Sequence, residues 1–137
     1  MNPYSKLEVG DIITDRYRVV RQLGQGGMGV VYEAEHVALK RRVALKVLLS
    51  DRTENELLVA RFIQEARAAA SIGHPGIVEV FDLGEDEKSG ETFIAMELLE
   101  GEELHARIKR EGQLPLDFVL RVGIELADAV AAAHEHG

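Results

Sequence analysis

The sequence predicts an α+β fold in which an antiparallel sheet carries one helix and is followed by a helical part. Short segments rich in β-branched and aromatic residues recur between turn signals. One amphipathic helical segment interrupts them, and two more helical segments close the chain. The order of three strands, a helix, two strands and two helices lacks the regular alternation of a doubly wound parallel sheet.

Five strands are predicted, each short and bounded by turn residues. They are expected at residues 17–23, 30–35, 42–49, 77–83 and 92–98. A glycine-rich turn joins the first two strands, and the polar loop GEDEKSGE joins the last two as a hairpin. Because side chains alternate between the faces of a strand, Lys46 is expected to share a face with Ala44.

The first helix is expected over residues 54–72, where one stripe of positions recurs at helical spacing. The stripe consists of Leu58, Phe62, Glu65, Ala69 and Ile72. Gly73 and Pro75 follow the stripe, which is typical of a helix end.

Two further helices are expected, over residues 102–110 and from Pro115 to His136. The last helix has apolar stripes on two sides and therefore requires packing partners on two sides. The 137 residues supply few such partners, so an exposed apolar patch is expected, which would favour self-association or a partner protein.

Composition excludes several classes of protein. Hydrophobic residues make up 46% of the 137 residues, which predicts a folded domain. The net charge of −8 argues against non-specific binding of nucleic acid. The absence of cysteine excludes disulfides, thiolate catalysis and cysteine-ligated metals. No apolar run approaches the roughly 18 residues of a membrane span and no signal peptide is evident, so a cytoplasmic location is expected.

The glycine-rich turn, LGQGGMGVVYEAE, contains the pattern G-x-G-x-x-G at Gly24, Gly26 and Gly29. The pattern alone is weak, because ordinary glycine-rich turns also produce it. A dinucleotide fingerprint requires a helix directly after the glycines, and a Walker loop requires Gly-Lys-Ser/Thr, whereas here a strand follows. A hairpin that covers phosphates with its backbone remains, and Val31 would offer an apolar surface to a flat base.

Lys46 and Glu65 are each unusual for their positions. Lys46 lies among aliphatic residues, and Glu65 lies on the apolar stripe of its helix. Each has an ordinary explanation, since a lysine can extend to solvent and a glutamate can lie at the edge of a stripe. Taken together they favour a buried ion pair that directs the lysine towards phosphates beneath the glycine turn.

At this point the chain resembles the N-terminal lobe of a eukaryotic-type (Hanks-type) serine/threonine protein kinase of the kind common in bacteria. The resemblance lies in LGQGGMGVVY, VALK, RFIQEARAAASIGHPGIVEVFDLGED and FIAMELLEGEEL, in that order. It covers the chain from about Ile12 onward. It implies an N-terminal extension at 1–11, an ATP-binding N-lobe with a five-stranded antiparallel sheet at 12–100, and two helices of an incomplete C-lobe at 101–137.

The resemblance implies roles on the phosphate side of an ATP site. Gly24, Gly26 and Gly29 would cover the phosphates. Lys46 would contact the α- and β-phosphates and Glu65 would brace it, which makes these two the implied catalytic residues.

The resemblance also implies roles around the adenosine. Leu23, Val31 and Ala44 would sandwich the adenine. Met96 would be the gatekeeper, a role compatible with ordinary core packing. The residues implied along the hinge and beside the ribose are Glu97, Leu99 and Glu103. The histidines are expected to be structural or solvated, with no metal bound.

The motifs H-R-D-x-x-x-x-N, D-F-G and A-P-E do not occur in these 137 residues. In the family they supply the catalytic base and the ligands of Mg²⁺, so this chain alone is expected to be catalytically incompetent. The first hypothesis is therefore a portion of a kinase that acts on a protein substrate. The alternatives are a non-catalytic module that binds nucleotide or a partner kinase, and a small α+β protein with inert motifs.

Overall fold

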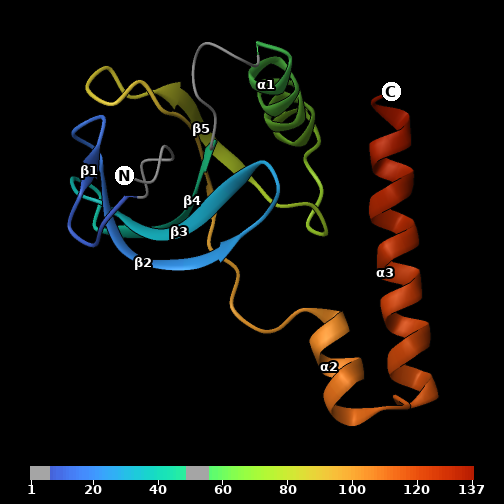
Figure 1. Cartoon of the computed structure of the whole chain (residues 1–137). Helices are drawn as coiled ribbons and strands as arrows, with labels where there is room; N and C mark the ends of the chain where they lie inside the picture. The colour runs from blue at the N-terminus through green and yellow to red at the C-terminus, as the bar shows by residue number, and fades with distance from the viewer. Residues whose placement is uncertain (1–6, 49–55) are drawn as a thin grey trace.

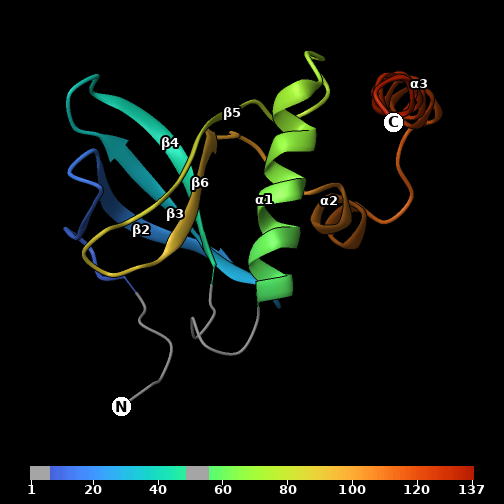
Figure 2. The same ribbon diagram turned by 90° about the horizontal axis from the view of Figure 1, so that it is seen from above.

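The computed structural model describes residues 7–48 and 56–137. The strands are β1 (Ile12–Ile13), β2 (Tyr17–Gln25), β3 (Gly29–His36), β4 (Arg41–Leu48), β5 (Val80–Glu85) and β6 (Thr92–Glu97). The helices are α1 (Glu56–Ser71), α2 (Leu104–Glu111) and α3 (Leu116–Glu135). The strands form one curled antiparallel sheet in the order β1-β2-β3-β4-β6-β5, and α1 lies across it (Figures 1 and 2).

The predicted fold class and element order are confirmed, with two corrections among the described residues. The sheet has six strands rather than five, because Ile12–Ile13 pairs with the start of β2. Two residues are too few to show alternation, so the sequence could not reveal this strand. The fifth predicted strand begins at Val80 rather than Ile77, since the Ile77 amide donates to the His74 carbonyl oxygen in a turn. Predicted strand residue 49 and helix residues 54–55 lie outside the described part.

The sheet buries apolar side chains on both faces. Inside the curl lies a cluster that includes Val19, Val30, Leu45 and Phe93. On the other face, Leu48 and Ile94 pack with Phe62 and Ala66 of α1. This second cluster holds α1 against the central strands.

Polar contacts join the two edges of the curled sheet. Asp86, buried after β5, accepts hydrogen bonds from the Thr14 amide at 2.7 Å and the Ser89 amide at 2.9 Å. The Tyr17 hydroxyl donates to Asp82 of β5 at 2.9 Å. Burial raises the pKa of Tyr17 to about 12, and the hydrogen bond to Asp82 adds to the shift. These bonds tie the β1–β2 edge to β5.

The helical part follows β6 through an irregular linker, and α3 returns beside the end of α1 (Figure 1). The turn between α1 and β5 contacts α3, where His74 bonds to Asp128 and Ala129 is buried. Elsewhere α3 is apolar and exposed, as predicted: Leu116, Val119, Leu120, Ile124, Leu126 and Val130. Self-association through this surface stays a prediction. Across residues 7–48 and 56–137, no helix combines the length and hydropathy that crossing a membrane requires.

Candidate functional site

The glycine-rich segment forms the turn between β2 and β3 (Figure 1). The Gly26 amide donates a hydrogen bond to the Gly29 carbonyl oxygen at 2.9 Å and closes the turn. From Gly29 the chain continues as β3 and not as a helix. This geometry excludes the dinucleotide fingerprint, which needs a helix N-terminus at the pyrophosphate.

The three glycines of the pattern have different surroundings. A Cβ atom on Gly29 would lie 2.5 Å from the carbonyl oxygen of Val47, so no side chain fits between β3 and β4 there. A Cβ atom on Gly24 or Gly26 would meet nothing within 4 Å. Gly29 therefore serves packing, whereas the backbone at Gly24 and Gly26 is open to approach by another molecule.

Four predicted site residues share one face of the sheet. In the strand register, Val31 lies opposite Lys46, which lies opposite Ile94, and Ala44 lies opposite Met96. Paired residues point to the same face, as do residues two apart in one strand. Ile94 and Met96 also pack in the cluster beneath α1. The apolar surface predicted for a base, the lysine and α1 therefore lie on the same side of the sheet.

The predicted ion pair between Lys46 and Glu65 is wrong for this structure. The two side chains form no ion pair, and Glu65 is exposed rather than half-buried. Phe62 and Ala66 are the residues of α1 that are buried against the sheet. The Lys46 Nζ atom instead lies 5.5 Å from the centroid of the Phe62 ring. An unpaired carboxylate is more stable in water than in the core. Glu65 therefore lies on the exposed side of α1, next to the buried residue Ala66.

The end of β6 is tied back to the residue before β5. The Glu97 amide donates to the Glu79 carbonyl oxygen at 2.9 Å, and the Glu79 amide donates to Glu97 Oε2 at 3.0 Å. Glu79 was not predicted from the sequence, because nothing in its spacing indicates this partner. Leu99 and Leu23 are 64% and 40% exposed, so both present apolar surface to solvent.

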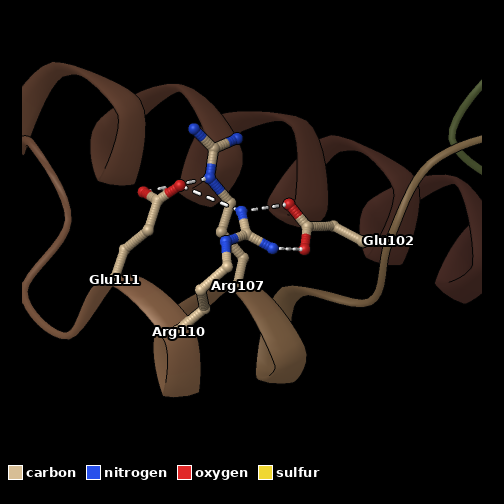
Figure 3. Close-up of polar contacts among 4 residues, drawn as sticks. All are labelled: Glu102, Arg107, Arg110 and Glu111. Atoms are coloured by element: carbon tan, nitrogen blue, oxygen red, sulfur yellow. Dashed lines mark hydrogen bonds and ion pairs between the residues drawn. The ribbon is translucent and has the colours of Figure 1, made fainter.

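A charged cluster holds the start and the end of α2 together (Figure 3). Arg110 donates to both carboxylate oxygens of Glu102 and, at 3.0 Å, to Glu111. Arg107 donates weakly to Glu111 at 3.5 Å. The hydrogen bonds from Arg110 lower the pKa of Glu102 and Glu111 and raise the pKa of Arg110. Glu103, implied beside the ribose, immediately precedes α2 and makes no side-chain cap.

Within 7–48 and 56–137, no group of three or more histidine, aspartate or glutamate side chains is placed to hold a metal ion.

The fold is a curled antiparallel sheet that one helix crosses, followed by a linker and two helices. A glycine turn joins two of its strands, and a lysine lies on one face of the sheet. Together these features define the class of protein kinase lobes. A family model described as "Protein kinase domain" matches residues 17–137. This chain belongs to the protein kinase family.

Similar proteins include kinases from several bacteria. Serine/threonine-protein kinase PknA of Mycobacterium tuberculosis is 41% identical over 132 residues, covering 94% of this chain and 31% of PknA. The probable serine/threonine-protein kinase PknB of Lactococcus lactis is 38% identical, covering 96% of this chain and 21% of PknB. The crystal structure of the M. tuberculosis PknI kinase domain superposes with a TM-score of 0.78 at 34% identity. That match covers 96% of this chain and 52% of the PknI chain, so these 137 residues span about half of a solved kinase domain.

Proposed function

We propose that this chain is the ATP-binding portion of a serine/threonine protein kinase. The observation that carries the proposal is the open backbone at Gly24 and Gly26 together with the shared face of Val31, Ala44 and Lys46. An adenine needs an apolar surface and a triphosphate needs amides and a cation. Val31 and Ala44 would supply the apolar surface and Lys46 the cation, on one face of the sheet.

The residues present fit ATP on this side. Gly24 and Gly26 would let the backbone of the glycine turn come close to the phosphates, because no side chain separates them. Lys46 would leave the Phe62 ring and bind phosphates. The negative charge of the bound phosphates makes this move of Lys46 favourable.

The hinge would contribute backbone groups. The Glu97 amide is already donated to Glu79, so Glu97 would offer its carbonyl oxygen to the adenine edge. Leu99, two residues further along the linker, would also offer backbone groups. Glu103 would lie near the ribose. Residues 12–100 would then form the ATP-binding lobe and 101–137 the first helices of the next lobe.

The 137 residues are proposed to bind ATP without transferring its phosphoryl group. Transfer requires metal-holding carboxylates and a base that orients the acceptor hydroxyl. The described residues do not fit a Mg²⁺ ion, since they contain no suitable cluster of ligands. A protein substrate would be phosphorylated only where further residues supply the metal ligands and the base.

Calorimetric titration with ATP tests the proposal. The unchanged chain should bind, and Lys46→Ala should weaken binding about tenfold or more, which is about 1.4 kcal/mol. Arg67→Ala is the matched control, because it removes one positive charge from an exposed position on α1. Absence of binding by the unchanged chain, or equal binding by Lys46→Ala, would contradict the proposal. A radiolabelled ATP assay should show no transfer to a generic protein substrate by the 137 residues.

A further inference from the structure

The linker between β6 and α2 is the covalent connection between the sheet and the helical part. Residues 98–103 belong to no helix or strand. Leu99 is 64% exposed, and Gly101 has a φ of +126°, a conformation that permits a sharp change of direction. The course of the linker therefore depends on few contacts.

Arg110 makes the contact that ties the end of this linker to α2 (Figure 3). Its guanidinium donates through Nη1 to Glu102 Oε2 and through Nη2 to Glu102 Oε1, the latter at 2.8 Å. Two parallel bonds fix orientation as well as distance, which a lysine could not do. Glu102 lies just before the N-cap residue Glu103, and Arg110 lies in the last turn of α2. The pair thus spans the whole helix and prevents the linker from pivoting about its start.

The contact extends beyond α2 into α3. Arg110 also donates to Glu111, to which Arg107 donates as well. The Arg107 guanidinium lies 4.2 Å from the centroid of the Phe118 ring in the first turns of α3. Linker, α2 and the start of α3 are therefore connected through one series of side chains.

We propose that Arg110 is a positioning residue of the nucleotide site, acting through Glu102. The proposal rests on the proposed ATP function. By holding Glu102, Arg110 would set the course of the linker that carries Leu99 and Glu103. Loss of the pair frees the linker, so ATP binding must order it again at a cost in affinity.

The two single variants separate positioning from simple charge. Arg110→Ala removes a positive charge, and Glu102→Ala removes a negative one. A net-charge effect on ATP would have opposite signs in the two variants, whereas loss of positioning weakens binding in both. We expect a two- to fivefold rise in Kd for each, about the size of an exposed ion pair. The double variant should be no weaker than either single variant, because both remove the same contact.

Lys109→Ala is the matched control, since Lys109 is an exposed cation on the same turn and makes no such pair. Its Kd should equal that of the unchanged chain. The difference between Arg110→Ala and the unchanged chain should shrink at about 1 M salt, where charges are screened within roughly 3 Å. Opposite signs for the single variants, additive effects in the double variant, or an equal effect of Lys109→Ala would overturn the proposal.

Hydrogen exchange of the amides at 107–112, which are hydrogen-bonded within α2 and at its end, gives a readout that needs no nucleotide. Exchange should be faster in Arg110→Ala and Glu102→Ala than in Lys109→Ala, while amides of β3 and β4 stay unchanged. Unchanged exchange at 107–112 would show that the Arg110–Glu102 pair does not hold α2 to the linker. If the unchanged chain fails to bind ATP, the proposed function fails together with the nucleotide role of Arg110, and the exchange result still decides whether Arg110 holds the linker.

Discussion

The imidazole of His74 joins the α1–β5 turn to α3 by using both ring nitrogens. Nδ1 accepts the Gly76 amide at 2.9 Å, so Nε2 carries the proton and donates to Asp128 Oδ2 at 2.8 Å. Beside this bond, a Cβ atom on Gly76 would lie 3.0 Å from the Ala129 Cβ atom. Ala129 is the buried residue of α3 within the described chain, so this small contact sets how α3 lies against the sheet.

Removing the acceptor of that bond should loosen α3 without unfolding the sheet. Asp128→Ala should increase hydrogen exchange in the second half of α3 and at Gly76, because the ring of His74 loses one of its two partners. Asp128→Asn keeps an acceptor oxygen and should stay close to the unchanged chain.

Glu125→Ala serves as control for Asp128→Ala. Glu125 lies one turn earlier on α3 and lines a cavity together with His74 and Asp128. A hydrogen bond from the imidazole to this largely exposed carboxylate contributes about 0.5–1.5 kcal/mol, so the exchange rates should rise up to about tenfold. Equal exchange in Asp128→Ala and Glu125→Ala would show that packing at Ala129 alone positions the helix.

Substitutions at two glycines of the turn should separate an effect on stability from an effect on ATP binding. Gly29→Ala should lower the free energy of unfolding by about 1–3 kcal/mol, because the new Cβ atom meets the Val47 carbonyl oxygen. Gly26→Ala should leave stability nearly unchanged, since its Cβ atom meets only open space. It should weaken ATP binding, because a side chain there would hold the phosphates away from the backbone. Urea denaturation and calorimetry measure the two effects. A stable Gly29→Ala variant would mean that β3 and β4 can separate at little cost.

Low pH should weaken the polar contacts that tie the β1–β2 edge of the sheet to β5. Burial opposes ionisation of Asp86, but the hydrogen bonds from Thr14 and Ser89 outweigh burial and lower its pKa below the ordinary value of 3.8. The charged form is therefore favoured in the folded state. Its contribution to stability is present above about pH 4 and is lost as the pH falls through the lowered pKa.

Urea denaturation at pH 3 and pH 7 measures this contribution. The stability difference between the unchanged chain and Asp86→Asn should be smaller at pH 3 than at pH 7. A stability difference independent of pH would show that the charge of the Asp86 carboxylate does not stabilise the contacts between the two edges. Asp15→Asn is the control, because Asp15 pairs with Lys88 at the exposed surface.

Much of the fold follows from local patterns. The predicted strands at 17–23, 30–35 and 92–98 lie in β2, β3 and β6 or differ from them by a residue or two, because alternation and turn residues act within a few positions. Strand β1 was missed because two residues carry no period. The start of β5 was misplaced because the turn at His74 depends on a contact with α3.

The site was predicted in part. Alternation along β4 correctly placed Lys46 beside Ala44, and the strand register brings Val31 and Met96 to the same face. The burial of Glu65 was wrong, since Phe62 and Ala66 are the buried residues of α1 in the described part of the chain and Glu65 lies beside them. The Arg110–Glu102 pair was not foreseen, because eight residues separate its members and α2 must form before they meet.

The sequence by itself determined the order of strands and helices, the glycine turn and the face on which the lysine lies, since periodicity and turn chemistry are properties of neighbouring residues. Only the tertiary structure decided that Lys46 lies over Phe62, that Gly29 packs on Val47 and that Arg110 holds the linker. Each of these contacts joins segments whose separation depends on how the sheet curls and how the helices dock, and no local pattern encodes those distances.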